Sequence, residues 1–303
     1  YGLVGSEMCI RDRAERLAFF HTPGMGLALV EGFELAWAGG FGWCEAGGEE
    51  QVTASTLFQA ASISKPVFAL AVMRLVQDGV LDLDRDVNDY LRSWRVPAND
   101  GWQPRATLRQ LLSHTAGVTV PGFPGYTAAE PVPGLAQVLA GDPEANTSRI
   151  EVNIVPGLTC RYAGGGTTIA QQAVMDVVGK PFPQIMRELV LEPLGMADST
   201  YEQPLPAAWA TRAATGYPYK GNPLPGRYHV YPEMAAAGLW TTPADLARVG
   251  MALMRAVSGG DAVLLDRKTV EAMLAPQHAV AREGYRPAIG FFLEGEGDDC
   301  CFY

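Results

Sequence analysis

The chain has 303 residues, 48% of them hydrophobic, and it carries 23 Lys and Arg residues against 33 Asp and Glu residues. Its net charge of −10 and its lack of a basic run argue against nucleic-acid binding, which requires clustered Lys and Arg to contact phosphates. No apolar run reaches the roughly 18 residues of a membrane span, because the best candidate, 66–76, contains Arg74. We therefore expect a globular chain of about two domains with a large core.

The two ends of the chain differ from its body. Residues 1–13 have neither helical nor strand periodicity, and we interpret them as a non-native leader that resembles translated adapter sequence. Residues 299–303 follow a strand-like run, and no closing element is predicted after it, so we expect a gene fragment that is incomplete at its C-terminus. No signal segment is visible, and the sequence assigns neither a compartment nor an oligomeric state.

Strand-like runs open the body. Residues 24–30 and 33–38 predict a β-hairpin with a turn at 31–32. From 62 to 78 apolar residues recur at helical spacing, and Gly79 ends the run. Short segments follow at 81–90 and 107–113.

Helices dominate the middle of the chain, and strand returns at its end. The patterns predict helices over 167–178 and 181–191, broken at Gly179. Thr242 followed by Pro243 predicts the start of a further helix that runs to about residue 256. Residues 286–293 read as a strand. We expect an α/β domain built from 14–80 and 237–303, split by a mainly helical domain over 81–236.

The sharpest chemical signal is the Ser-x-x-Lys sequence formed by Ser62 and Lys65 at a predicted helix start. At i, i+3 the two side chains share a face, and a Ser hydroxyl becomes a nucleophile only with a base within hydrogen-bond reach. A partly buried Lys near the positive end of a helix has its charged form disfavoured, so it can serve as that base. Taken alone, Ser62 is also explained as a helix cap, and the local motif does not decide between the two interpretations.

The surrounding sequence changes that balance, because it resembles the serine β-lactamase-related superfamily of class C β-lactamases, D-alanyl-D-alanine carboxypeptidases and related esterases. The resemblance is carried in order by five landmarks: Phe58–Pro66 around the nucleophile, Leu111–Gly117, Pro156–Gly166, Pro193–Met196 and Ala237–Leu246. The fold it implies is α+β, with an antiparallel sheet flanked by helices, an inserted helical domain, and the site in the cleft between them.

The resemblance also implies roles for individual residues. Ser62 would be acylated, Lys65 would activate it, and Tyr162 would carry the proton between Ser62 and the leaving group. The alternative for Tyr162 is an aromatic residue that fixes a Gly-rich turn. We expect His114 to organise its loop rather than to act as a base, and Ser64 to be a second hydroxyl in the first helical turn.

Two departures from the family pattern bear on substrate. Gly164, a predicted substrate-binding position, stands where related β-lactamases carry Asn, and this favours an esterase or peptidase. The family's third motif, Lys-x-Gly or His-x-Gly on a strand, is missing. Since that strand supplies one of the two oxyanion donors, we expect the chain as given to be nearly inactive, and we expect the motif within about 15 residues after Asp299 in an intact gene.

The sequence therefore predicts a serine hydrolase that forms an acyl-enzyme with a small or peptide-like ester, amide or D-amino-acid substrate. The alternatives are a class C-type β-lactamase and a non-catalytic penicillin- or peptidoglycan-binding relative. No cofactor or metal is predicted: the five cysteines form no Cys-x-x-Cys pair and the four histidines show no ligand spacing. Gly-x-Ser-x-Gly and P-loop sequences are also missing, which argues against an α/β-hydrolase and a nucleotide enzyme.

Overall fold

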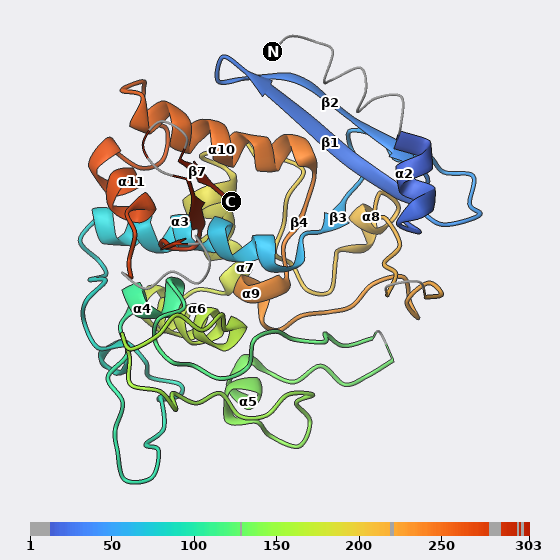
Figure 1. Ribbon diagram of the computed structural model, residues 1–303. Coiled ribbons are helices and arrows are strands. Elements are labelled where there is room, and N and C mark those ends of the chain that lie inside the picture. Colours follow the sequence, from blue (N-terminus) through green and yellow to red (C-terminus); the bar gives the residue numbers. More distant parts are fainter. Residues whose placement is uncertain (1–12, 128, 219–220, 279–285, 296, 298–299) are drawn as a thin grey trace.

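The computed structural model describes residues 13–127, 129–218, 221–278, 286–295, 297 and 300–303. Helices and small antiparallel sheets make up the described part, so the predicted α+β class is confirmed (Figure 1). The helices are α2 (Arg13–Phe19), α3 (Ser64–Gln77), α4 (Leu108–Leu112), α5 (Leu135–Ala140), α6 (Gly164–Val178), α7 (Phe182–Met186), α8 (Ala207–Ala210), α9 (Met234–Ala237), α10 (Pro243–Val257) and α11 (Arg267–Leu274). The strands are β1 (Gly24–Glu31), β2 (Glu34–Gly42), β3 (Phe58–Gln59), β4 (Trp240–Thr241), β5 (Arg286–Pro287), β6 (Phe292–Glu294) and β7 (Cys301–Phe302).

The predicted N-terminal hairpin is confirmed. Strands β1 and β2 pair antiparallel, and the register shifts between Leu29 and Val30. Gly32 and Phe33 connect them with positive φ values of 57° and 62°, which suits the two-residue turn that matches strand twist. Helix α10 packs against both strands (Figure 1).

Helix α3 runs through the centre of the core. All seven residues from Val67 to Met73 are buried, and α9 and α11 pack against the helix. The predicted helix over 62–78 begins two residues later than expected, because residues Ala61–Ile63 form a 3₁₀ turn before α3. The predicted nucleophile therefore lies on a tight turn at the helix entrance rather than within the helix.

The helices of the middle region begin and end close to the predicted residues. Gly179 ends α6 in the left-handed conformation, with φ +72°. The predicted helix over 181–191 is divided into α7 and a π-helical turn, Arg187–Leu191. Thr242 caps α10 by accepting a hydrogen bond from the Asp245 N–H at 3.3 Å, as predicted.

The prediction of one strand over 286–293 is wrong, because the chain turns back on itself there. Strands β5 and β6 form an antiparallel hairpin, and β7 pairs with the far edge of β6. Gly290 makes the turn with φ +78°, and a Cβ atom there would lie 2.4 Å from Ala69 Cβ on α3. Only glycine allows this close approach, so the hairpin packs directly on α3.

One hydrophobic cluster connects the regions that the sequence assigns to different domains. It includes residues of α3, α10 and α11 together with residues of α4 and α6. The helices α4 to α8 all fall within 81–236, the range predicted to be mainly helical. Among the described residues, no helix is long and apolar enough to cross a membrane.

Candidate active site

Ser62 is exposed on the 3₁₀ turn that leads into α3. The preceding residue, Ala61, has φ +44°, a conformation that costs free energy for a residue with a Cβ and persists only where neighbours hold it. Ser64 supplies that support: its hydroxyl donates to the Ala61 carbonyl at 2.5 Å and accepts from the Leu239 N–H at 3.0 Å. The turn that presents Ser62 is thereby fixed to the segment between α9 and β4.

Lys65 is buried one turn further along, with 5% of its surface exposed. Its Nζ donates to Ser62 Oγ at 2.9 Å and to the Ala236 carbonyl at 2.8 Å. Burial lowers the pKa of Lys65, and the nearby Tyr162 phenol opposes part of this effect. The free energy needed to remove a proton from Lys65 is therefore reduced at the atom that contacts the Ser62 hydroxyl.

The segment that carries the Ala236 carbonyl is held from α6. Gln171 is buried there, and its amide oxygen accepts from the Ala235 N–H at 2.8 Å while its amide nitrogen donates to the Pro232 carbonyl at 3.1 Å. Both contacts fix the segment that carries Ala236. The sequence analysis missed Ala236 and Gln171, because a backbone carbonyl leaves no residue-type signal and a lone Gln in a helix is unremarkable.

Tyr162 lies beside Lys65, just before α6. The centroid of its ring is 5.1 Å from Lys65 Nζ, and 39% of the residue's surface is exposed. The rings of His114 and Phe292 lie 4.4 Å and 6.4 Å from it, so Phe292 brings β6 to this site. The structure thus brings all three predicted residues, Ser62, Lys65 and Tyr162, into one group, and it adds Phe292, which the sequence analysis did not single out.

His114 occupies a structural position beside this group. It is buried with φ +60°, its Nδ1 accepts from the Ala163 N–H at 3.2 Å, and its carbonyl accepts from the Arg161 N–H at 2.8 Å. Burial, reinforced by the charge of Lys65, lowers the pKa of His114 to about 3. The His114 ring is therefore neutral, and its Nδ1 is already engaged by the Ala163 N–H next to Tyr162. This arrangement favours the loop-organising role predicted for His114.

Gly164 is the first residue of α6, two positions after Tyr162. Its N–H donates to the Pro121 carbonyl at 3.0 Å, so its backbone donor is already used within the protein. It has no side chain to offer a polar group, and the predicted part of Gly164 in substrate binding can therefore be one of shape alone.

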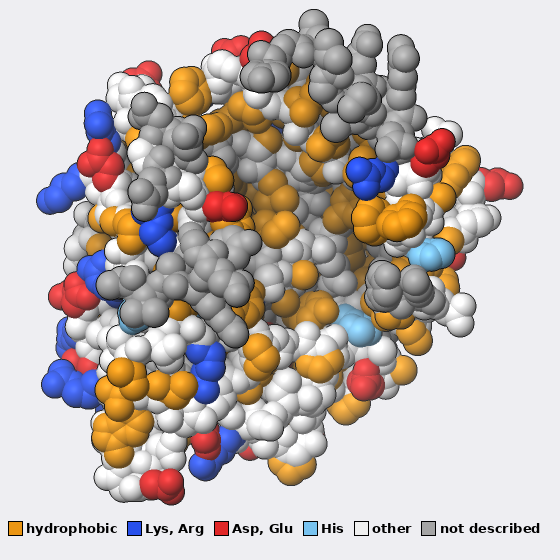
Figure 2. All heavy atoms as spheres, viewed as in Figure 1, with side chains coloured by type: hydrophobic (Ala, Val, Ile, Leu, Met, Phe, Trp, Pro, Cys, Tyr) orange, Lys and Arg blue, Asp and Glu red, His pale blue; other side chains and the backbone are white. Residues whose placement is uncertain are grey.

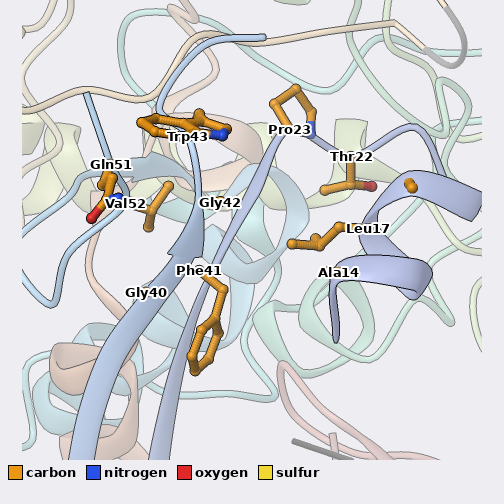
Figure 3. Close-up of a pocket in the computed structure, with 11 residues that line it drawn as sticks. Ala14, Leu17, Thr22, Pro23, Gly40, Phe41, Gly42, Trp43, Gln51 and Val52 are labelled. Atoms are coloured by element: carbon orange, nitrogen blue, oxygen red, sulfur yellow. The ribbon is translucent and has the colours of Figure 1, made fainter. Parts of the chain in front are cut away.

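The face of the molecule shown in Figure 2 is hollowed over the region where Figure 1 draws β3, β4 and the beginning of α3, and hydrophobic side chains surround the hollow. A separate cavity of about 630 Å³ lies between α2 and β2. Leu17 points into it from α2, and Trp43 and Val52 border it (Figure 3). None of the three predicted catalytic residues lines this cavity, so it is distinct from the candidate active site.

Comparison with known proteins places these features in a family. The model of the Beta-lactamase family matches residues 12–299, nearly the whole chain. The chain belongs to this family. Among curated relatives, Esterase EstB of Burkholderia gladioli is 31% identical over 169 residues, which cover 54% of this chain and 43% of EstB. The match thus covers less than half of the length of EstB.

Solved structures agree on the fold. The octameric penicillin-binding protein homologue from Pyrococcus abyssi has a TM-score of 0.74 and 23% identity, and the match covers 96% of this chain and 65% of that one. A beta-lactamase/D-alanine carboxypeptidase from Pseudomonas syringae has a TM-score of 0.73 and 19% identity, covering 95% of this chain and 75% of that one. The predicted superfamily and fold are confirmed.

Proposed function

We propose that the chain provides the nucleophile and base of a serine hydrolase that cleaves carboxylic esters through an acyl-enzyme on Ser62. The observation that carries the proposal is the 2.9 Å contact between Lys65 Nζ and Ser62 Oγ, made by a buried lysine whose second acceptor is a fixed backbone carbonyl. Esters are favoured because position 164 has no amide side chain and because EstB is an esterase by name.

In the proposed reaction Ser62 Oγ attacks the acyl carbon while its proton passes to neutral Lys65. The tetrahedral intermediate collapses when the bond to the leaving alkoxide breaks. The alkoxide takes the proton held by Lys65 through Tyr162, whose ring centroid lies 5.1 Å from Lys65 Nζ. Water then attacks the Ser62 ester by the reverse path and releases the acid. Burial of Lys65 favours this cycle, because it makes the neutral amine accessible at lower pH.

The test is covalent labelling by a fluorophosphonate, followed by intact mass spectrometry of the chain. We expect one adduct per chain on the unaltered protein, no adduct on Ser62→Ala, and normal labelling of Ser258→Ala, which removes an exposed hydroxyl at the end of α10. Labelling that persists at another serine in Ser62→Ala would remove Ser62 from this role. An adduct formed with penicillin on Ser62 and never released would point instead to a non-catalytic penicillin-binding relative.

A further inference from the structure

The segment 118–126 packs against the first turn of α6, beside Tyr162. The Gly164 N–H donates to the Pro121 carbonyl and the Gly165 N–H donates to the Val120 carbonyl, both at 3.0 Å. Val120 has φ +60°, which is a strained conformation for a β-branched residue and is kept only where the surroundings enforce it. This path of the chain is therefore imposed by its contacts with α6.

Phe123 lies on this segment with its ring directed at Gly164. A Cβ atom at position 164 would lie 3.0 Å from Phe123 Cε2, 3.5 Å from Phe123 Cδ2 and 3.2 Å from the Pro121 carbonyl oxygen. A larger side chain at 164 would fit only if the ring moved away. The ring thus lies next to the space that a side chain at the third position of the Tyr162 motif would enter.

The far end of the segment 118–126 is fixed by its own contacts. Tyr126, three residues later, pairs with Val230 by two backbone hydrogen bonds of 2.9 and 2.7 Å, and the Tyr126 hydroxyl accepts from the Asn146 N–H at 3.0 Å. Phe123 is half-buried and packs against the hydrophobic core with part of its surface exposed. An aromatic surface in a fixed position is what an apolar acyl group needs for selective contact.

We propose that Phe123 determines acyl specificity: its ring takes the place of a polar side chain at position 164 and forms the apolar wall that receives the acyl group. This inference rests on the proposed ester hydrolysis and names its substrate class, esters of apolar carboxylic acids. A ring offers no hydrogen bond to an amide in the acyl group, and apolar contact grows with each methylene of the acyl chain.

The catalytic test compares acylation of Ser62 by p-nitrophenyl acetate and p-nitrophenyl octanoate, measured as the p-nitrophenol burst and as adduct mass. We expect the unaltered chain to prefer octanoate, and Phe123→Ala to reduce that preference by about tenfold. Phe123→Leu, which keeps an apolar wall, should retain most of it. The matched control is Phe19→Ala on α2, where the ring is 73% exposed, and it should leave the preference unchanged.

A second measurement tests the geometry without any turnover. Gly164→Asn should lower the thermal unfolding midpoint because its side chain meets the Phe123 ring, and adding Phe123→Ala should recover part of that loss. Strictly additive midpoint changes in this double-mutant cycle would overturn the proposal. So would an unchanged octanoate preference in Phe123→Ala with labelling intact. Failure of both esters to acylate a chain completed through the missing third motif would instead reject the proposed function, and the acyl assignment with it.

Discussion

The starts of α3 and α6 both contribute to the candidate site, but they are built from opposite materials. At the start of α3, polar side chains are buried and paired: Ser64 bonds two backbone groups and Lys65 bonds Ser62 and Ala236. At the start of α6, glycine allows a neighbouring segment and the Phe123 ring to approach within van der Waals distance. Proton transfer requires fixed donor–acceptor distances, which buried directional hydrogen bonds provide, whereas selection of an apolar group requires only shape.

The largest expected effect comes from breaking the polar side at Lys65. Lys65→Met keeps the length and burial of the side chain but removes the amine that contacts Ser62 Oγ, and it leaves the Ala236 carbonyl unpaired. We expect the rate of Ser62 labelling to fall by about 10²–10⁴-fold, the contribution of a positioned general base. Stopped labelling time courses measure it, and Lys268→Met on the exposed surface of α11 is the control. A labelling rate within a few-fold of the unaltered chain would contradict the role of Lys65 as base.

Tyr162 lies between the start of α3 and the start of α6, and its substitution tests whether the site needs its phenol oxygen or only its ring. Tyr162→Phe keeps the ring that contacts His114 and Phe292 but deletes the phenol oxygen. In a protein completed through the missing third motif, we expect turnover of a p-nitrophenyl ester to fall by about 10²-fold with little change in the melting temperature, since packing is preserved. A variant that unfolds at lower temperature but keeps its specific activity would support instead the alternative in which Tyr162 only fixes the Gly-rich turn.

Glu233 differs from the other buried polar residues near the start of α3, because its carboxyl group is buried without a hydrogen-bond partner among the described residues. It immediately precedes α9, is fully buried, and neither carboxyl oxygen has a partner within the described protein. Burial raises the pKa of Glu233 from 4.5 to about 7, and the phenols of Tyr126 and Tyr231 lie near enough to feel its charge. Burial therefore favours the neutral acid of Glu233 in the folded chain below about pH 7.

The sign of the resulting pH dependence follows from linkage. Below pH 4.5 both folded and unfolded chains hold the proton, whereas between about 4.5 and 7 the unfolded chain loses it first, so the free energy of unfolding falls as pH rises. The total loss is at most about 3 kcal/mol. Glu233→Gln, which stays neutral, should remove this loss, measured by denaturant unfolding at pH 5 and pH 8. Glu202→Gln, at an exposed carboxylate, is the control.

Titration of His114 does not affect the difference in pH dependence between Glu233→Gln and the unaltered chain. Its lowered pKa makes stability rise with pH between about 3 and 6.5, the opposite direction, but the contribution is common to the unaltered chain and the variant and cancels in their difference. An equal pH dependence in Glu233→Gln and the unaltered chain would show that Glu233 is already ionised in the folded protein at pH 5.

The sequence alone determined the elements and the family. Alternation and turn chemistry predicted the hairpin over 24–38, a cap and a proline predicted the start of α10, and the order of five landmarks predicted the family. The local Ser-x-x-Lys spacing also selected Ser62 and Lys65, and the family resemblance added Tyr162. The fold brings all three together.

Tertiary structure decided what local patterns do not encode. The strand predicted over 286–293 became a hairpin because Gly290 must turn against Ala69, a residue more than 200 positions away. The Ala236 carbonyl that fixes Lys65, the Phe292 ring beside Tyr162 and the Phe123 ring beside Gly164 all come from distant segments. Their parts in the site depend on packing between elements, and the free energy of such contacts is determined by the whole core rather than by any window of sequence.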